Sequence, residues 1–205
     1  LNDDQKMLSR TVSDFGKKES TLERFRKQRD AEGLGWDPAT WRKMGELGWL
    51  AVSFPDAVGG SDGSFVETAL ILEQFGKTLV PEPILPSLVL GGTALLLGGD
   101  AGQHERFLTP MINGETTLAL AYGEGGTRTD RTTPTCTATA KGAGYVLSGK
   151  KHFVLNGHGA NHIVVSAMVD GELSLFVVDA DAVKRTELRL IDGHRGAHID
   201  LAGVE

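Results

Sequence analysis

The sequence predicts an α+β protein, with an all-helical N-terminal domain over residues 1–114 and a β domain over residues 115–205. Two observations support this class. Apolar residues recur at steps of three and four up to Gly114, and from Thr117 onward the apolar period changes to two. Helices therefore come first and strands second. This segregation indicates α+β organisation rather than the β-α-β alternation of a dinucleotide-binding fold.

Three helix starts are marked by capping residues. The cluster Asn2-Asp3-Asp4 precedes the first apolar stripe, and Asp37 precedes Pro38, whose fixed φ suits a first helical turn. Ser64 and Glu67 have the spacing of a capping box. The first stripe comprises Met7, Leu8, Val12, Phe15, Leu22 and Phe25.

Glycines and prolines mark where the predicted helices end. Gly48 lies near the end of the helix that begins at Pro38, and Gly76 is placed as the C′ glycine of the helix after Ser64. A fourth helix is expected within 84–97 and a short fifth over 103–112.

The second half predicts short strands joined by glycine turns. Asp170-Gly171 between two apolar runs indicates a hairpin. The expected strands begin near Thr117 and then cover 136–140, 145–147, 151–155, 162–169, 173–178, 183–191 and 197–201. The last strand leaves an open sheet edge, from which we expect the chain to be incomplete or completed by another chain.

Composition excludes several classes of protein. Lysine plus arginine number 21 and aspartate plus glutamate 27, a net charge of −6, which argues against a nucleic-acid partner. A single cysteine, Cys136, excludes an internal disulfide framework and fits a reducing cytoplasm. No apolar run reaches the roughly 18 residues of a membrane-spanning helix.

The run 122–130, Tyr-Gly-Glu-Gly-Gly-Thr-Arg-Thr-Asp, is the strongest candidate site. Successive backbone amides of such a loop can form an anion nest, with Arg128 nearby to hold phosphate oxygens. An irregular surface connection is the alternative. The run is not a Walker loop, because no Gly-Lys-Ser/Thr follows, and a strand rather than a helix comes next.

Other polar residues support weaker hypotheses. Glu124 is either a general base or one half of a structural ion pair with Arg128. Cys136 has no charged neighbour in the sequence, which argues against a nucleophile. A metal site among the late histidines is the less favoured interpretation, since rim loops are their commoner place: His152, His158, His162, His194 and His198.

Four sequence blocks follow one another along the chain: the run 47–55 followed by Gly59-Gly60, the run 118–130, the run 145–151 and the run 156–157. In this order they resemble the acyl-CoA dehydrogenase family over essentially all 205 residues. The first block is similar to the family's leucine-glycine, proline, glycine-glycine signature, and the second resembles the strand and loop where the family usually has Thr-Glu-Pro-Gly-x-Gly-Ser-Asp. The third and fourth match the following Tyr-x-Leu-x-Gly-x-Lys and Asn-Gly blocks.

The resemblance implies a fold and a cofactor. The second domain would be an incomplete part of the family's middle β-barrel, and the family's C-terminal four-helix bundle, which supplies the catalytic base, is absent from this sequence. FAD would then be the cofactor and α,β-dehydrogenation of an acyl-CoA thioester the reaction, in fatty acid metabolism. Expected partners are an acyl-CoA substrate and an electron-transfer flavoprotein or similar acceptor, in a homotetramer or an α2β2 heterotetramer.

The same resemblance assigns cofactor-binding residues but no catalytic one. Tyr122 and Gly123 would meet the pyrimidine side of the flavin, and Phe153 would lie beside the ring. Thr129 matches a serine that contacts both FAD and acyl-CoA. The full cofactor-binding set is Leu120, Tyr122, Gly123, Thr129, Phe153 and Leu155.

Two departures from the family pattern favour an alternative function. Gly123 stands where the family usually has threonine, and Leu155 stands where it has threonine or serine. Each removes a hydroxyl hydrogen bond to the cofactor, a loss of roughly 0.5–1.5 kcal/mol. The alternative is a non-catalytic partner subunit of a hetero-oligomeric acyl-CoA dehydrogenase.

Overall fold

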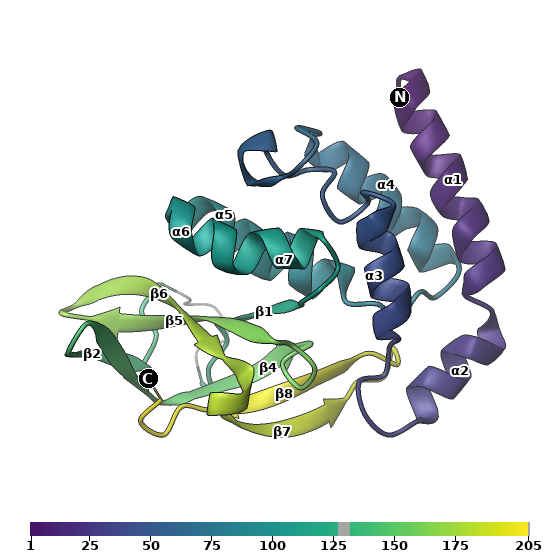
Figure 1. The fold of residues 1–205 in the computed structure, drawn as a ribbon. Coiled ribbons are helices and arrows are strands. Elements are labelled where there is room, and N and C mark those ends of the chain that lie inside the picture. The colour runs from purple at the N-terminus through teal and green to yellow at the C-terminus, as the bar shows by residue number, and fades with distance from the viewer. Residues whose placement is uncertain (127–131, 205) are drawn as a thin grey trace. The chain divides into compact units, whose positions relative to one another are not determined.

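The computed structural model of the chain describes residues 1–126 and 132–204. Its contacts divide the chain into two compact units that are interleaved in sequence. The first comprises Leu1–Leu85 and Ala101–Glu115, and the second comprises Pro86–Asp100 and Thr116–Glu205. Helices before strands confirm the α+β class (Figure 1). The single domain boundary between residues 114 and 115 stays a prediction.

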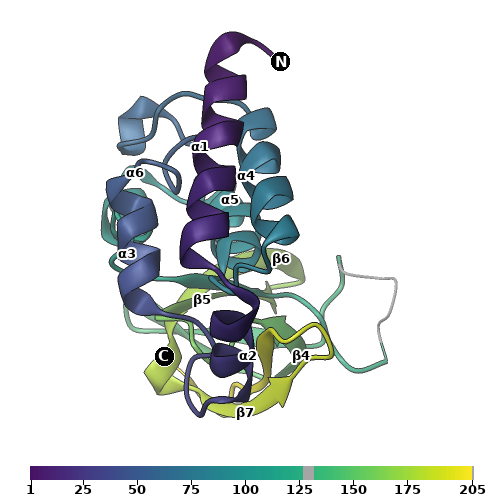
Figure 2. The same ribbon diagram turned by 90° about the vertical axis from the view of Figure 1, so that its right-hand side faces the viewer.

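The first unit is helical, as its apolar periodicity predicts. The aromatic rings of Phe15, Trp49 and Phe75 pack at centroid separations of 5.0–6.0 Å, where α1 and α4 lie side by side (Figure 2). Its elements are α1 (Asp3–Glu19), α2 (Leu22–Asp30), α3 (Pro38–Glu46), η1 (Asp56–Val58), α4 (Phe65–Lys77), α6 (Ala101–Gln103), the π-helical turn η3 (His104–Leu108) and α7 (Thr109–Ile112).

The three predicted helix starts are confirmed. Asn2 and Gln5 form a capping box at α1, Asp37 caps α3, and Ser64 with Glu67 forms the capping box of α4. The first apolar stripe, however, spans two helices. Thr21 accepts a hydrogen bond from the Arg24 amide and starts α2 as a new helix.

One predicted helix end is wrong. Gly76 lies inside α4, and Leu79 adopts the left-handed conformation at φ 53° after Thr78 has capped the helix. Gly48 does have the positive φ, 74°, expected of a glycine at a helix end. The error at Gly76 arose because an interior helical glycine and a C′ glycine look alike in sequence.

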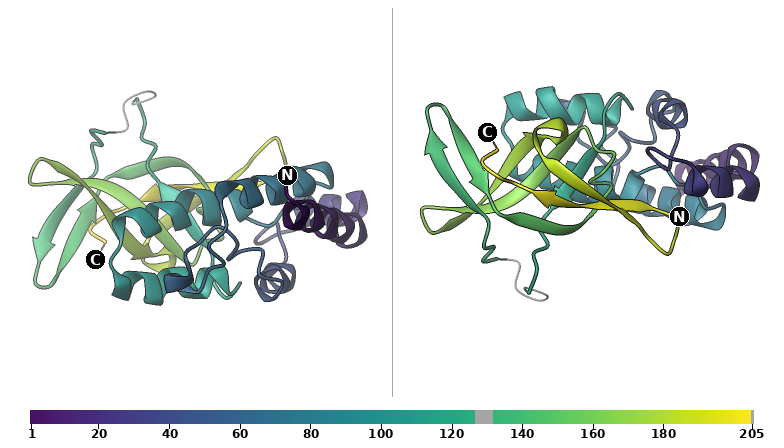
Figure 3. Two further views of the ribbon diagram at one scale, coloured as in Figure 1. Left: turned by 90° about the horizontal axis from the view of Figure 1, so that it is seen from above. Right: turned by 90° about the horizontal axis from the view of Figure 1, so that it is seen from below.

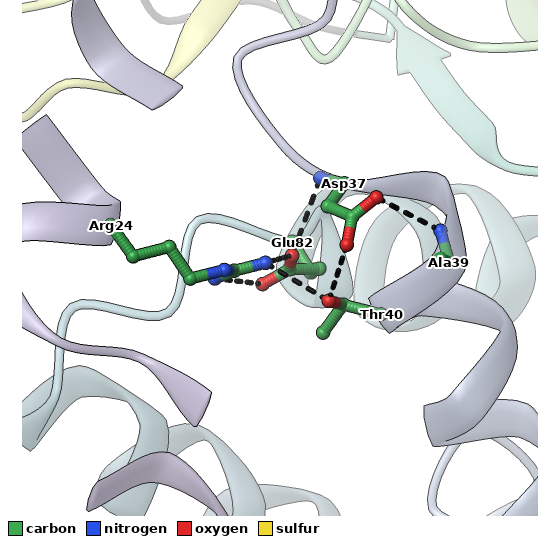
Figure 4. Close-up of polar contacts among 5 residues, drawn as sticks. All are labelled: Arg24, Asp37, Ala39, Thr40 and Glu82. Carbon is green, nitrogen blue, oxygen red and sulfur yellow. Dashed lines mark hydrogen bonds and ion pairs between the residues drawn. The ribbon is translucent and has the colours of Figure 1, made fainter. Parts of the chain in front are cut away.

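The first unit contains a polar cluster around the buried carboxylate of Glu82 (Figure 4). Arg24 forms a close ion pair with Glu82 and donates to Thr40 Oγ1 at 3.1 Å, and Thr40 donates to Asp37 at 2.8 Å. Burial outweighs the hydrogen bond from Arg24 and raises the pKa of Glu82. The cluster therefore joins α2 to the cap of α3 through a group that ionises reluctantly.

The second unit contains the strands together with one helical segment. Its elements are η2 (Leu85–Gly92, π-helical), α5 (Thr93–Gly98), β1 (Leu118–Ala121), β2 (Thr137–Lys141), β3 (Gly144–Ser148), β4 (Lys150–Leu155), β5 (His162–Val169), β6 (Glu172–Asp179), η4 (Ala180–Ala182), β7 (Lys184–Arg189) and β8 (Arg195–Asp200). Every predicted strand is present, and the expected fourth helix is formed by η2 and α5. The hairpin turn at Asp170-Gly171 is confirmed by φ angles of 51° and 86°.

The strands form two sheets around one core. The larger sheet has the order β1-β5-β2-β3, with β6 on the other edge of β5, and the smaller has the order β4-β8-β7. Ile163 of β5, Val154 of β4 and Ile199 of β8 lie in one buried cluster. Figure 1 shows the two sheets as layers, and in Figure 3 their ribbons overlap. The parallel pairing of β1 and β5 brings segments 44 residues apart into register.

The helical segment η2 fixes strand β1 within the second unit. Ser87, fully buried, donates to the carbonyl of Leu118 at 3.0 Å and accepts from its amide at 3.2 Å. Gly91 must lack a side chain, because a Cβ there would come within 2.7 Å of the Leu118 Cβ. This close packing holds β1, whose end leads into the glycine-rich loop.

Candidate functional site

The glycine-rich loop after β1 is attached to strand β4. The backbone N–H of His152 donates to the carbonyl of Gly123 at 2.8 Å. A Cβ on Gly123 would lie 3.0 Å from the carbonyl oxygen of His152, and one on Gly125 would lie 3.4 Å from its ring nitrogen Nε2. The loop therefore runs close against β4. Two stretches that the sequence marked separately are neighbours in the fold.

Strand β4 contains a bulge at the residues that face this loop. Its register with β8 runs from Lys151 opposite Ile199 to Val154 opposite Ala197, so His152 and Phe153 together oppose one residue, His198. Phe153 has a left-handed φ of 56°, and its side chain is 61% exposed. Without the extra residue, strand alternation would turn Phe153 inward with Lys151. The bulge thus presents an aromatic ring outward from a strand of the core.

The expected cofactor residues fall on β1, the loop and β4. Leu120 is half-buried in β1 and pairs with Val164, and Tyr122 and Gly123 are half-buried in the loop that follows. Leu155 is half-buried two residues beyond Phe153, on the strand that carries the bulge. Thr129, like Arg128, lies outside the described residues. Described members of the set therefore gather where the loop meets β4, and their contact with a cofactor stays a prediction.

Glu124 is a structural residue rather than a general base. Its carboxylate accepts hydrogen bonds from the Thr135 amide and hydroxyl, both at 2.6 Å, and from the Cys136 amide at 3.1 Å. It also accepts from Lys151 Nζ at 2.6 Å. Burial alone would raise the pKa of Glu124, but these hydrogen bonds, that from Lys151 first, lower it to about 2. A carboxylate this acidic and this fully bonded is a poor proton acceptor at neutral pH.

Cys136 has no charged neighbour in the sequence, but the fold brings two charged side chains beside it. The thiol is fully buried, and Glu124 with its partner Lys151 lies beside it. Burial, followed by the hydrogen bond with Glu124, raises the pKa of Cys136 to about 11. The thiol stays protonated near neutral pH, which agrees with the expectation that it is not a nucleophile.

Sequence reasoning gave no site role to Lys151, and it considered His152 and His198 only as candidate metal ligands, yet all three shape this site. Lys151 appeared only as the last letter of a family block, yet it is fully buried. The signal available was its position, since a lysine at the inward-facing phase of a strand must find an acidic partner inside. The two histidine rings lie 4.8 Å apart, edge to face, and this contact required the register of β4 and β8.

The described part of the site fits a flat, hydrogen-bonding cofactor such as a flavin. Phe153 offers an exposed aromatic face, and aromatic rings stack on planar ligands. Three residues after Phe153, just beyond the end of β4, Asn156 is 4% exposed. Its side-chain Nδ2 has no hydrogen-bond partner among the described residues. A buried donor without a partner is costly in a folded chain and is a ready contact for a ligand. Gly123 and Leu155 supply no side-chain donor.

The weaker hypothesis of a metal site finds no support within residues 1–126 and 132–204. No three of the His, Cys, Asp and Glu side chains described there converge as metal ligands. His152 and His198 instead pack against each other. None of the helices in the same part of the chain has the length and apolar character that crossing a bilayer requires.

Two family models match the chain. The model of the "Acyl-CoA dehydrogenase, N-terminal domain" matches residues 2–115, and that of the "Acyl-CoA dehydrogenase, middle domain" matches residues 119–200. Similar proteins include the "Probable acyl-CoA dehydrogenase YngJ" of Bacillus subtilis, 29% identical over 88% of this chain and 49% of its own length. The mouse mitochondrial short-chain specific acyl-CoA dehydrogenase is 31% identical over 83% of this chain and 41% of its own length. The chain thus spans half or less of these relatives.

Solved structures share the fold. The "Tcur3481-Tcur3483 steroid ACAD G363A variant" has a TM-score of 0.89 at 29% identity, over 98% of this chain and 55% of that chain. The ChsE4-ChsE5 complex from Mycobacterium tuberculosis has a TM-score of 0.87 at 26% identity, over 100% and 55%. An acyl-CoA dehydrogenase from Bacillus anthracis complexed with FAD has a TM-score of 0.88 at 26% identity, over 100% and 36%. The chain belongs to the acyl-CoA dehydrogenase family and covers its N-terminal and middle domains.

Proposed function

We propose that this chain is the N-terminal and middle part of an FAD-dependent acyl-CoA dehydrogenase, which introduces an α,β double bond into an acyl-CoA thioester. The observation that carries the proposal is the junction of the Tyr122–Gly126 loop with the bulged strand β4, where Phe153 is presented outward. Membership of the family supports it, as does a similar fold crystallised with FAD.

In this proposal the chain binds and orients, and it supplies no catalytic acid or base. Flavins accept the hydride in dehydrogenations of this kind. Phe153 and the half-buried Leu155 bound the space beside the ring and exclude water from it. The backbone of Tyr122 and Gly123 provides hydrogen-bonding groups. The proposed nest at Gly125 and Gly126, with Thr129 and Arg128 beyond the described residues, meets phosphate oxygens of FAD or acyl-CoA.

A second function is favoured by two specific observations. Gly123 and Leu155 both lack the hydroxyl that would donate to a flavin, and one similar structure is the ChsE4-ChsE5 complex of two different proteins. The chain is then the non-catalytic subunit of an α2β2 assembly whose partner carries the working flavin. In either function, the lipid-metabolic role, the cytoplasmic location and electron transfer to a flavoprotein acceptor belong to the proposal.

The test begins with the natural polypeptide that carries residues 1–205, purified alone and after co-expression with related subunits. A yellow protein with the absorbance of oxidised flavin, and with acyl-CoA oxidation by an artificial acceptor, supports the first function. Flavin and activity that occur only with a partner subunit support the second. A protein that is colourless in both preparations and takes up no added FAD overturns both.

A further inference from the structure

The interior of the second unit holds a buried ion pair between the glycine-rich loop and strand β4. Glu124 Oε1 and Lys151 Nζ are 2.6 Å apart, with side-chain exposures of 2% and 0%. Lys151 also donates to the Ser166 hydroxyl of β5 at 3.1 Å. These contacts lie inside the second unit, and the pair connects the loop to both sheets.

The carboxylate joins the two ends of the loop segment. Glu124 precedes residues 125–134, and its oxygens accept from the residues that follow them, at 2.6 Å from Thr135 and 3.1 Å from Cys136. Glu124 and Thr135 are 11 residues apart in the sequence, so the carboxylate holds two separate stretches of the chain together. Gly125 and Gly126, on which the proposed phosphate contacts depend, follow Glu124 directly.

Lys151 connects Glu124 to the bulged strand β4. Lys151 is followed directly by His152, whose amide donates to Gly123, and by Phe153, whose ring is exposed. The ion pair and the backbone hydrogen bond lie on consecutive residues of β4 and reach consecutive residues of the loop. Together they define the position of the Gly123 backbone relative to the bulge that carries Phe153.

A purely stabilising role does not account for this arrangement well. Buried ion pairs often contribute no more to the free energy of unfolding than apolar residues of similar volume would. What charges add is directional geometry, because each donor must aim at one oxygen. The donors to Glu124 come from two separate places, the loop end (Thr135 and Cys136) and β4 (Lys151), and Lys151 in turn donates to Ser166 of β5.

We propose that Glu124 and Lys151 are positioning residues for the flavin-binding loop, and that they set the distance between the Gly123–Gly126 backbone and the ring of Phe153. The inference rests on the proposed flavin-binding function and goes beyond it, because neither residue is assigned a contact with the cofactor. Both act through the loop and β4.

The test replaces both charges by neutral side chains of similar shape, in Glu124→Gln/Lys151→Met. The experiment uses the natural polypeptide in the oligomeric state in which it purifies. We expect FAD to bind about tenfold or more weakly. The absorption bands and fluorescence of bound flavin should also shift, because the loop no longer holds one geometry against the ring. The single variant Lys151→Met, which keeps the other hydrogen bonds of Glu124, serves if the double variant does not fold.

The control removes another buried ion pair, in the other compact unit. Arg24→Met/Glu82→Gln also replaces a buried carboxylate and its partner, but these residues hold α2 and α3. We expect an unchanged flavin spectrum and an FAD affinity within about twofold of wild type. Wild-type affinity and spectrum in the Glu124/Lys151 variant would overturn the positioning role.

Hydrogen exchange separates this inference from the proposed function. Amide exchange is measured on flavin-free protein, for peptides covering residues 120–126 and 132–137. Faster exchange confined to these peptides in the Glu124/Lys151 variant supports the positioning role even if no form binds FAD, in which case only the flavin function fails. Unchanged exchange there contradicts the positioning role whatever the wild type binds.

Discussion

The backbone N–H of Phe153 donates to Nδ1 of His198 at 3.3 Å, across the point where β4 carries one residue more than β8. A side chain here replaces the ladder hydrogen bond that the bulge interrupts. Since a bulge leaves its extra residue unpaired, such a replacement lowers the cost of the strained φ at Phe153. The imidazole can accept this bond only through an unprotonated Nδ1.

Replacing His198 should therefore loosen the bulge. We expect His198→Leu to lower the free energy of unfolding by about 1 kcal/mol, because one hydrogen bond and the ring contact with His152 are lost. In a flavin-binding preparation, the FAD affinity should fall about fivefold. Chemical unfolding and FAD titration measure the two effects. His194→Leu, on the exposed turn before β8, is the matched control. Equal FAD affinities for the two variants would contradict the role given to His198.

A second prediction concerns the close packing at the turn between β3 and β4. Gly149 has a φ of 135°, and a Cβ there would lie 2.4 Å from Cys136 Sγ and 2.9 Å from Cys136 Cα. Gly149→Ala should lower the free energy of unfolding by about 3 kcal/mol, because a backbone atom cannot move aside as a flexible side chain would.

Gly144→Ala provides the control at the other end of β3. An added Cβ at Gly144 would meet nothing within 4 Å, so the expected change is within about 0.5 kcal/mol. Urea unfolding of both variants is the measurement. A Gly149→Ala protein as stable as Gly144→Ala would show that this turn is not packed as described.

Local signals in the sequence predicted most of the fold. Ser64 and Glu67 mark a helix start within four residues, and Asp170-Gly171 marks a hairpin within two, so both could be read without tertiary information. Glu124 was different. Its described partner Lys151 lies 27 residues away, whereas Arg128, the partner expected from the sequence, lies outside the described residues. Only the pairing of strands determines which charges meet in the interior.

The bulge at His152 and Phe153 was beyond prediction for a related reason. Strict alternation from Lys151 would place Phe153 in the core, and an aromatic residue in a strand is usually buried there. The extra residue becomes evident only from the register with β8. The family resemblance implies that Phe153 lies beside the flavin, which stays a prediction, but it does not explain how the ring comes to be exposed.

The cluster around Glu82 predicts a pH-dependent stability. Burial raises the pKa of Glu82, and removing the opposing charge in Arg24→Met should raise it further. A carboxyl group whose folded pKa exceeds its unfolded value stabilises the fold below the unfolded pKa, and this stability is lost as pH rises through the folded pKa. Arg24→Met should therefore lower the free energy of unfolding by about 3 kcal/mol or more at pH 8, and by much less near pH 4.5.

Urea unfolding of wild type and Arg24→Met across this pH range measures the difference. Arg29→Met is the matched control on the same helix, because its ion pair with Asp30 is exposed. Arg29→Met should change the free energy of unfolding by no more than about 0.5 kcal/mol. A cost of Arg24→Met that is independent of pH would show that Glu82 does not change its protonation state in this range.

Gly123, which stands where the family resemblance implies a threonine, gives the sharpest test of the flavin site. A Cβ at Gly123 would lie 3.0 Å from the His152 carbonyl, so any larger residue crowds β4 slightly. Gly123→Thr and Gly123→Val crowd it equally and differ only by a hydroxyl. If the position faces a flavin, the threonine variant should bind FAD about three- to tenfold more tightly than the valine variant, the value of one hydrogen bond. Isothermal titration with FAD measures both affinities, and thermal unfolding checks that the variants are equally stable. Identical affinities would mean that this position does not reach the cofactor.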